Sequence, residues 1–246
     1  MFPILFSSST FTLYSYPIFL GLALGVVYYT AFYLFLSTNR KEVIFHKIFW
    51  PAVICAWIGA KVFFLLSVKA IQTTDELVWN SSFWLGGGFV FFGGLIFALV
   101  YMLIGVWRKW FSISDISLFI PAIAWGHAIG RIGCFLAGCC YGKHSDLIDH
   151  IYLHGDFRYP VQLYESASLI VLGFILFKMV KKHYSAWTII ASYIVGYSLL
   201  RFGLEFLRGD KIRGLWWGVS TSQIISLIMA IFVASFWIIK HKKLSK

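Results

Sequence analysis

Charged residues are scarce in this sequence. Asp, Glu, Lys and Arg make up 13% of the 246 residues, whereas 60% are hydrophobic and 20% are aromatic. A soluble domain has roughly 45–50% apolar and about 25% charged residues. Because so few charges cannot cover the surface of a water-soluble globule, we predict an all-α integral membrane protein.

Acidic residues are scarcer still, since 21 Lys and Arg stand against 10 Asp and Glu and give a net charge of +11. A nucleic-acid-binding protein gathers its basic residues in one patch or stripe, but here they are scattered between apolar runs, so we expect no nucleic acid partner. The sequence also lacks a P-loop, a dinucleotide-binding motif and a soluble second domain. We predict one polytopic membrane domain over residues 1–246, with no cofactor and no metal.

About seven segments are long and apolar enough to cross a membrane, which takes about 20 residues in a helix. The first has neither the basic start nor the small-residue cleavage site of a signal peptide, so we expect it to remain as a helix. The predicted spans are 14–36, 45–68, 83–107, 114–136, 160–180, 186–206 and 216–239.

Basic residues in the loops predict the orientation, because cytoplasmic loops are rich in Lys and Arg. They gather in every second connection and in the C-terminal tail, while the opposite loops are poorer, apart from 208–214. We therefore predict a membrane protein with its N-terminus outside and its C-terminus in the cytoplasm. The basic residues on the cytoplasmic side are Arg40, Lys41, Lys47, Arg108, Lys109, Lys178, Lys181, Lys182, Lys240, Lys242, Lys243 and Lys246.

Polar side chains of several spans fall at one depth near the outer surface. A charge inside a membrane costs ~2.5–3.5 kcal/mol on insertion scales, and such residues usually face a bundle interior or a polar cavity. We therefore predict a polar cavity that opens near the outer lipid headgroups. Its predicted lining is Tyr16, Lys61, Arg131, Gln162, Glu165, Arg201 and Glu205.

Two of these spans carry arginines in a helical repeat. His127, Arg131 and Cys134 follow i, i+4, i+7 spacing on one face, and Arg201, Glu205 and Arg208 repeat it. Guanidinium groups suit phosphate, so the two helices can clamp a phospholipid headgroup. The alternative is an internal Arg201–Glu205 pair with an Arg131 that reaches toward the membrane surface. His127 is either a general base or a buried, hydrogen-bonded histidine.

Several segments resemble those of prolipoprotein diacylglyceryl transferases, in the order of that family. They are 87-GGFVFFGGLI-96, 114-SDISLFIPA-122, 130-GRIGCFLAGCCYG-142, 159-YPVQLYE-165, 201-RFGLEFLRGD-210 and 220-STSQIISL-227. The resemblance implies a seven-helix bundle in the bacterial inner membrane, with its N-terminus outside. It also implies transfer of the diacylglyceryl group of phosphatidylglycerol to a lipobox cysteine thiol, with release of glycerol phosphate. Arg131 and Arg201 match the essential arginines of the family, and Tyr16, Asp115, Gln162, Glu165 and Glu205 fall on further family positions.

The sequence departs from the family at four positions. Members usually read G-R-x-G-N-F-x-N-G-E, where this chain has Cys134, Ala137 and Cys139, and the histidine of the third span is Phe92. The thiolate is the nucleophile in thiol chemistry, and Phe92 cannot help to form it. We therefore predict a divergent lipid transferase that uses phosphatidylglycerol or a similar donor. Its acceptor, a protein or a small molecule at the outer face, differs from the usual lipobox cysteine.

We assign roles on this basis. Arg131 and Arg201 bind and polarise the departing phosphate, and Glu205 orients Arg201. His127, Glu165 or the Cys139 thiol handles the proton. The remaining predicted substrate-binding residues are Tyr16, Lys61, Cys134, Gln162 and Arg208. The alternative function is that of a catalytically silent relative, a module that binds lipids or membrane proteins.

Three cysteines close the signature region: Cys134, Cys139 and Cys140. They are either small residues that allow close helix packing or groups that react or contact the acceptor. Two further alternatives are a disulfide and a zinc site, although C-x4-C-C is not a familiar ligand spacing. Cys55 is expected to be a plain core residue.

Overall fold

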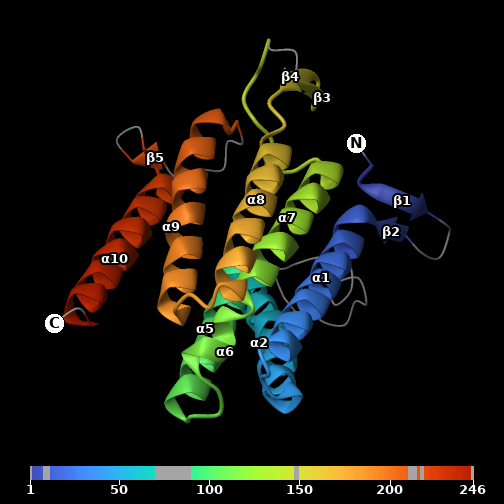
Figure 1. Ribbon diagram of the computed structural model, residues 1–246. Coiled ribbons are helices and arrows are strands. Elements are labelled where there is room, and N and C mark those ends of the chain that lie inside the picture. Colours follow the sequence, from blue (N-terminus) through green and yellow to red (C-terminus); the bar gives the residue numbers. More distant parts are fainter. Residues whose placement is uncertain are drawn as a thin grey trace. The chain divides into compact units, whose positions relative to one another are not determined.

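The computed structural model describes residues 2–7, 12–69, 90–146, 150–209, 215–216 and 219–244, and most of them are helical (Figure 1). The α-helices are α1 (Ser15–Ser37), α2 (Glu42–Lys69), α5 (Phe91–Trp107), α6 (Ile113–Ser117), α7 (Ile120–Ala137), α8 (Val161–Lys181), α9 (Ala186–Leu204) and α10 (Thr221–Leu244). A 3-10 turn, η1 (Glu205–Leu207), follows α9.

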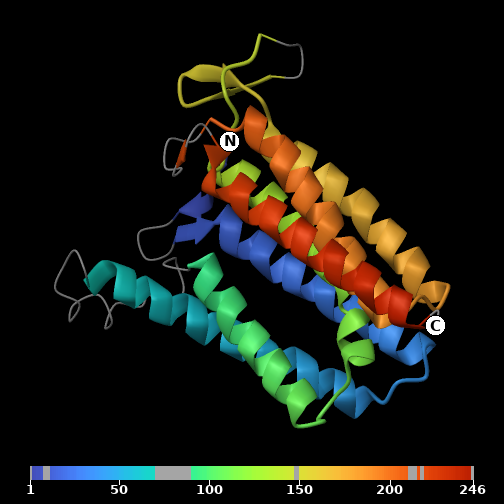
Figure 2. The same cartoon turned by 90° about the vertical axis from the view of Figure 1, so that its left-hand side faces the viewer.

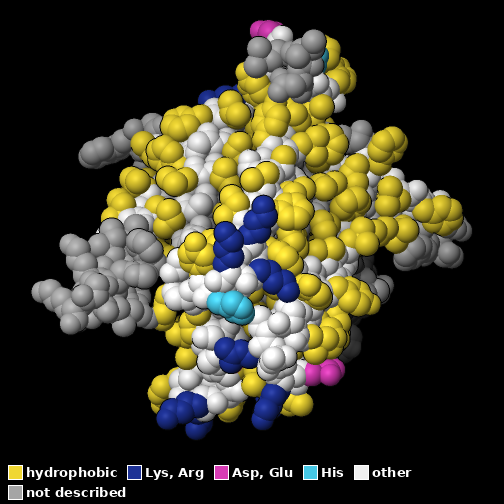
Figure 3. Space-filling model, viewed as in Figure 1, with side chains coloured by type: hydrophobic (Ala, Val, Ile, Leu, Met, Phe, Trp, Pro, Cys, Tyr) yellow, Lys and Arg dark blue, Asp and Glu magenta, His cyan; other side chains and the backbone are white. Residues whose placement is uncertain are grey.

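The prediction of an all-α membrane protein is confirmed. Among the described residues, five helical spans are long and apolar enough to cross a membrane, and two shorter apolar helices accompany them, at Phe91–Trp107 and Thr221–Val233. Hydrophobic side chains dominate the face shown in Figure 3, as expected of helices that face lipid. The total of seven spans and the orientation stay predictions. The first part of the predicted span 83–107, up to residue 89, lies outside the described residues.

Three short antiparallel hairpins were not predicted. They pair β1 (Ile4–Ser7) with β2 (Thr12–Tyr14), β3 (Ile151–Leu153) with β4 (Asp156–Arg158), and β5 (Leu215–Trp216) with β6 (Val219–Ser220). Each strand has two to four residues, which is too short for the alternating pattern that identifies a strand in a sequence.

The predicted span 114–136 is two helices, because the chain turns at residues 118–119 between α6 and α7. Pro121 lies in the first turn of α7, where a helix tolerates its missing N–H. At the other end, α7 stops at Gly138, which adopts the left-handed conformation with φ 75°, as is common at helix C-termini. This stop ends the helix just before Cys139.

The chain divides into two compact units, one of Met1–Ala31 with Ser117–Lys246 (unit 1) and one of Phe32–Ile116 (unit 2). In unit 1, α7 packs against α8, α8 against α9, and α9 against α10, as Figures 1 and 2 show. Its core includes the fully buried Ala122, Ala128, Leu169 and Leu176. The prediction of a single membrane domain stays a prediction.

In unit 2, α2 and α5 approach each other so closely that glycine is required at the crossing. A methyl group at Gly93 would overlap the Gly59 carbonyl oxygen and the Phe63 side chain. Small residues at helix crossings are typical of membrane proteins, where close packing drives association. The Gly-Gly pair of the third predicted span is therefore explained by packing in this unit.

Asp115 anchors the start of α6 within unit 2. Its carboxylate accepts hydrogen bonds from the Ser112 N–H and hydroxyl, at 2.8 and 2.7 Å, and lies 3.2 Å from Arg40. A buried carboxylate needs such partners to offset the loss of hydration. In this structure Asp115 therefore fixes the turn that precedes α6.

We predict that Gly93→Ala destabilises the protein by about 1–3 kcal/mol, because an added methyl overpacks the crossing. Unfolding of the detergent-solubilised chain by heat or denaturant measures the effect. Gly21→Ala is the matched control, since nothing lies within 4 Å of the added methyl. Equal stability of the two variants would show that the crossing is looser than described.

Candidate functional site

Glu165, in the second turn of α8, is the centre of a buried polar cluster in unit 1. Its side chain is about 2% exposed, and its Oε1 lies 3.0 Å from the Arg131 guanidinium of α7. The Tyr197 hydroxyl of α9 donates a hydrogen bond to the same oxygen, at 2.9 Å. His127, one turn before Arg131, lies 3.9 Å from it through Nε2. Three helices thus surround one carboxylate.

Tyr197 is a site residue that sequence reasoning missed. Its ring meets the His127 imidazole edge-on, with centroids 4.9 Å apart, and stacks on Tyr193. Tyr193, Tyr197 and Arg201 recur every fourth residue on α9, and residues at i and i+4 share a helix face. This spacing was the available signal.

Arg201 forms a second charged pair. Its Nη2 lies 2.8 Å from Glu205 Oε2 and donates a hydrogen bond to the Ser222 hydroxyl of α10, at 3.2 Å. The internal pair allowed by the sequence is therefore present. Arg201 and Arg131 both lie within electrostatic range of Glu165 and Tyr197, so the structure brings the two arginines to one site.

The prediction that Arg201, Glu205 and Arg208 share one helical face is wrong for Arg208. The α-helix ends at Leu204 and η1 at Leu207, so Arg208 adopts an extended conformation and forms a β-bridge with Gly142. It is buried and still within electrostatic range of Arg201. The 3-10 turn changes the side-chain direction after Glu205, which a count of 3.6 residues per turn cannot anticipate.

Two guanidinium nitrogens in this cluster are buried and have no hydrogen-bond partner among the described residues: Arg131 Nε and Arg201 Nη1. A buried donor without a partner costs about 1–3 kcal/mol, and donors on charged groups cost more. Such groups need an explanation. A bound anion supplies one, because a guanidinium presents its donors as a fork that fits phosphate or carboxylate oxygens.

The other predicted site residues are placed as follows. Gln162 is buried, and its amide donates to the Cys139 carbonyl at 2.6 Å, while its Oε1 has no partner among the described residues. Tyr16 begins α1 beside Gly133 and within electrostatic range of Arg131 and the thiols. Lys61 is buried on α2 and belongs to unit 2, so its part in this site stays a prediction.

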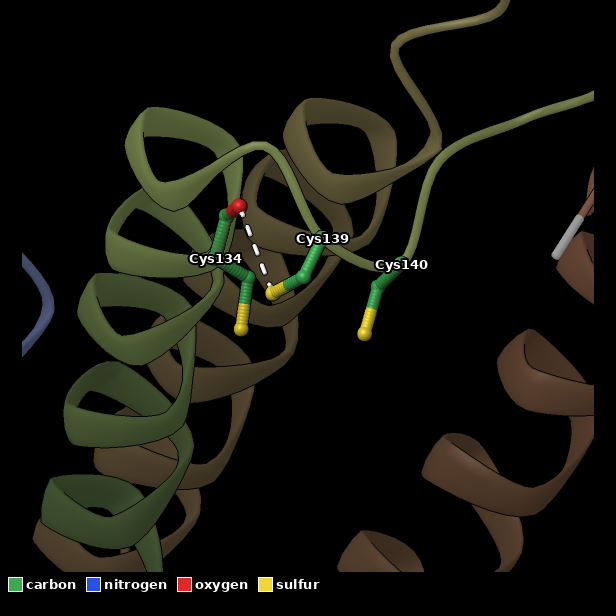
Figure 4. A group of neighbouring side chains, drawn as sticks. All are labelled: Cys134, Cys139 and Cys140. Atoms are coloured by element: carbon green, nitrogen blue, oxygen red, sulfur yellow. Dashed lines mark hydrogen bonds between the residues drawn. The ribbon is translucent and has the colours of Figure 1, made fainter. Parts of the chain in front are cut away.

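Cys134, Cys139 and Cys140 form what we call the thiol cluster (Figure 4). Their sulfur atoms all lie within 4.8 Å of one another, and all three thiols are free. Cys134 is in the last turn of α7, and the Cys139 thiol contacts the Cys134 carbonyl oxygen at 3.6 Å. The fourth cysteine, Cys55, is half-buried on α2 in unit 2 and is also free.

A separate, exposed charge cluster joins residues 144–146 to β4 of the β3–β4 hairpin. His144 Nδ1 lies 2.6 Å from Asp156 and Nε2 lies 3.0 Å from Asp146. Hydrogen bonds to these carboxylates raise the pKa of His144 above its ordinary value of 6.5, and the bond to Asp156 has the larger effect. The hydrogen bond between His144 and Asp156 also lowers the pKa of Asp156 below its ordinary value of 3.8.

The fold and the buried cluster around Glu165 define a class of protein: a polytopic membrane protein with two arginines and two carboxylates buried together in one helical unit. The sequence model of the prolipoprotein diacylglyceryl transferase family matches residues 3–239. The chain belongs to the prolipoprotein diacylglyceryl transferase family, and the resemblance seen in the sequence motifs is confirmed.

Individual relatives agree with this assignment. The chain is 34% identical over 186 residues to a phosphatidylglycerol–prolipoprotein diacylglyceryl transferase of Clostridium tetani, which covers 71% of this chain and 73% of the relative. It is 31% identical over 231 residues to a protein of Clostridium perfringens named as the second such transferase, covering 89% and 88%. A relative with the same name from Actinobacillus pleuropneumoniae is 29% identical over 218 residues, covering 84% and 80%.

We predict that the hairpin is best protected from hydrogen exchange between pH values of about 4 and 6.5. Because the pKa of His144 is raised on folding, its contribution to stability is complete below pH 6.5, the unfolded-state pKa. This contribution is lost as the pH rises through the folded-state pKa. Because the pKa of Asp156 is lowered on folding, its contribution to stability is complete above pH 3.8, the unfolded-state pKa. This contribution is lost as the pH falls through the folded-state pKa. Because stability follows the difference in proton binding between folded and unfolded states, both terms act together only in this window.

Hydrogen exchange of peptides covering 143–159, corrected for intrinsic rates, measures this protection through the Ser145 and Tyr159 amides, which donate to the Phe157 and Lys143 carbonyls and so join residues 143–145 to the β4 side of the hairpin. His144→Gln serves as the control and should flatten the upper limb. Constant protection in the wild type as the pH passes the His144 pKa would contradict the prediction.

Proposed function

We propose that this chain is a phosphatidylglycerol-dependent transferase of the bacterial inner membrane, which takes the diacylglyceryl group from its lipid donor. The observation that carries this proposal is the pair of buried guanidinium nitrogens, on Arg131 and Arg201, that have no partner among the described residues. The names of the relatives, phosphatidylglycerol–prolipoprotein diacylglyceryl transferases, support the choice of donor.

The donors of the cluster fit a phosphodiester. Glu165 and Glu205 pair with Arg131 and Arg201. A phosphodiester oxygen supplies the acceptor that the buried Arg131 Nε and Arg201 Nη1 lack among the described residues.

The same arginines serve the chemical step. When the bond between the glyceryl carbon and the phosphate oxygen breaks, the leaving glycerol phosphate gains negative charge. Donors that are already aimed at that oxygen stabilise the transition state without reorganising. Glu165 and Glu205 hold Arg131 and Arg201 at 3.0 and 2.8 Å, and one buried nitrogen of each guanidinium, Arg131 Nε and Arg201 Nη1, is left for the phosphate.

His127 is the group placed to take a proton in this cluster. Its Nε2 lies 3.9 Å from Glu165, and its ring rests against Tyr197. A carboxylate behind an imidazole stabilises the imidazolium that forms on proton transfer. Glu165 itself is already paired with Arg131, so we assign it the role of orienting His127 and Arg131.

The acceptor half of the proposal rests on the substituted positions. Phe92, Cys134, Ala137 and Cys139 replace side chains that the family uses near the acceptor, so we propose an acceptor other than the usual lipobox cysteine. The same substitutions favour a second candidate, a catalytically silent relative that binds lipid. Both candidates bind lipid, but only the transferase releases glycerol phosphate from it.

We predict that Arg131→Ala and Arg201→Ala each reduce release of glycerol phosphate by about 100-fold or more, as expected for loss of a donor to developing charge. Purified protein in nanodiscs with headgroup-labelled phosphatidylglycerol gives the measurement. Arg108→Ala is the matched control, because Arg108 is exposed and stacks on Trp107 in unit 2. Lipid binding by the wild type without any release, with a range of thiols and alcohols as acceptors, would establish the silent relative instead.

The acceptor is tested in cells depleted of their own prolipoprotein diacylglyceryl transferase. We expect that expression of this chain does not restore growth, because the resemblance implies that side chains with which the family meets its lipobox acceptor are replaced. A family member with the usual signature is the positive control. Full rescue would overturn the altered acceptor and leave the proposed donor intact.

A further inference from the structure

The thiol cluster has the spacing of a metal site. Zinc–sulfur bonds are about 2.3 Å long, so thiolates around a tetrahedral zinc stand about 3.8 Å apart. The three sulfur atoms here already lie within 4.8 Å of one another. Movements of less than about 1 Å, within the reach of side-chain rotation, therefore close the site around an ion.

The backbone is bent to bring the third thiol in. Gly138 and Cys140 both have positive φ, 75° and 60°. A non-glycine residue in this region is uncommon and costs energy. The bend turns the chain back after Cys139, and Figure 4 shows the three sulfur atoms directed to the same side. Close packing does not require a thiol at position 139, because Cys139 is exposed and Gly133 makes the close contact with Phe19.

The loop that carries Cys139 and Cys140 is held from several directions. The Gln162 amide donates to the Cys139 carbonyl at 2.6 Å, and the His154 ring lies 2.9 Å from the Gly138 carbonyl. Beyond the cysteines, Lys143 N–H donates to the Leu207 carbonyl at 2.8 Å. A site whose ligands are fixed by such surrounding contacts binds without a large ordering cost.

The surrounding charges also suit a zinc–thiolate group. Three thiolates and one Zn²⁺ carry a net charge of one negative unit. Arg131 and Arg208 both lie within electrostatic range of the cluster. Their positive charges oppose a bare cation but stabilise the anionic complex, which selects three thiolate ligands over neutral thiols.

We propose that Cys134, Cys139 and Cys140 bind one Zn²⁺ as three thiolate ligands, and that the fourth tetrahedral position binds the thiol of the acceptor. Among the described residues, no imidazole or carboxylate joins the three thiols. Three protein ligands with one position left for substrate is the arrangement of catalytic zinc. The second part rests on the proposed transferase function, whereas the metal site does not.

Zinc in this position supplies what Phe92 cannot. A thiol that coordinates zinc is deprotonated, so the acceptor gives up its proton on binding, and His127 is the group that takes it. The thiolate sulfur then attacks the glyceryl carbon, and the bond from that carbon to the phosphate oxygen breaks. Glycerol phosphate leaves with the electron pair, held by Arg131 and Arg201. The three cysteines stay ligands throughout, because a thioether on one of them would be a poor leaving group.

Cadmium titration of the reduced, chelator-treated full chain in detergent tests the metal site. We expect one Cd²⁺ per chain, seen as a thiolate-to-cadmium charge-transfer band, because soft thiolates bind this ion well. Cys134→Ser, Cys139→Ser and Cys140→Ser should each weaken binding at least about tenfold. Cys55→Ser, the matched control in unit 2, should leave it unchanged. No band, or a disulfide found by mass among the three cysteines after purification without reductant, would overturn the site.

Cobalt substitution tests the fourth ligand. Addition of N-acetylcysteine methyl ester should raise the thiolate-to-cobalt absorption by about one third, because a fourth thiolate joins three, whereas the serine analogue should not. No rise with the thiol would overturn acceptor coordination. An intact metal band with no glycerol phosphate release would count against the transferase, and release that persists in chelator would count against the zinc role, so the two failures are distinguishable.

Discussion

The buried carboxylate of Glu165 is the constraint on which the site depends. Taking an ion out of water costs several kcal/mol even after the protein relaxes, and this cost is offset only if the partners are placed well. Arg131 and Tyr197, from α7 and α9, both reach one oxygen of Glu165 on α8, at 3.0 and 2.9 Å. Any shift between these helices would leave a charge unpaired, so the cluster fixes their register.

In the proposed site, the two arginines serve both the structure and the ligand. One edge of each guanidinium is bound to a glutamate, and one buried nitrogen of each has no partner among the described residues. Without the carboxylates the two cations would repel each other, and with all donors engaged no anion would bind. Partial satisfaction holds the arginines ready, which lowers the ordering cost of binding.

Two of the replaced signature positions belong to the thiol cluster. Cys134 and Cys139 stand where the resemblance implies an amide and a carboxylate, and with Cys140 they place three soft donors at the end of α7. Under the proposed function, the phosphate-binding half of the site keeps the arginines and glutamates of its family, while the half that meets the acceptor has exchanged hard ligands for soft ones.

The sequence by itself determined the position of the first span and of local pairs, because both depend on neighbours along the chain. The predicted span 14–36 is the helix Ser15–Ser37, and the i, i+4 spacing of Arg201 and Glu205 produces an ion pair. Only the tertiary structure decided that Tyr197 meets Glu165, that Arg208 leaves its helix, and that three thiols converge. These features follow from the packing of distant helices and from a positive φ at Cys140, and neither is encoded in hydrophobic periodicity.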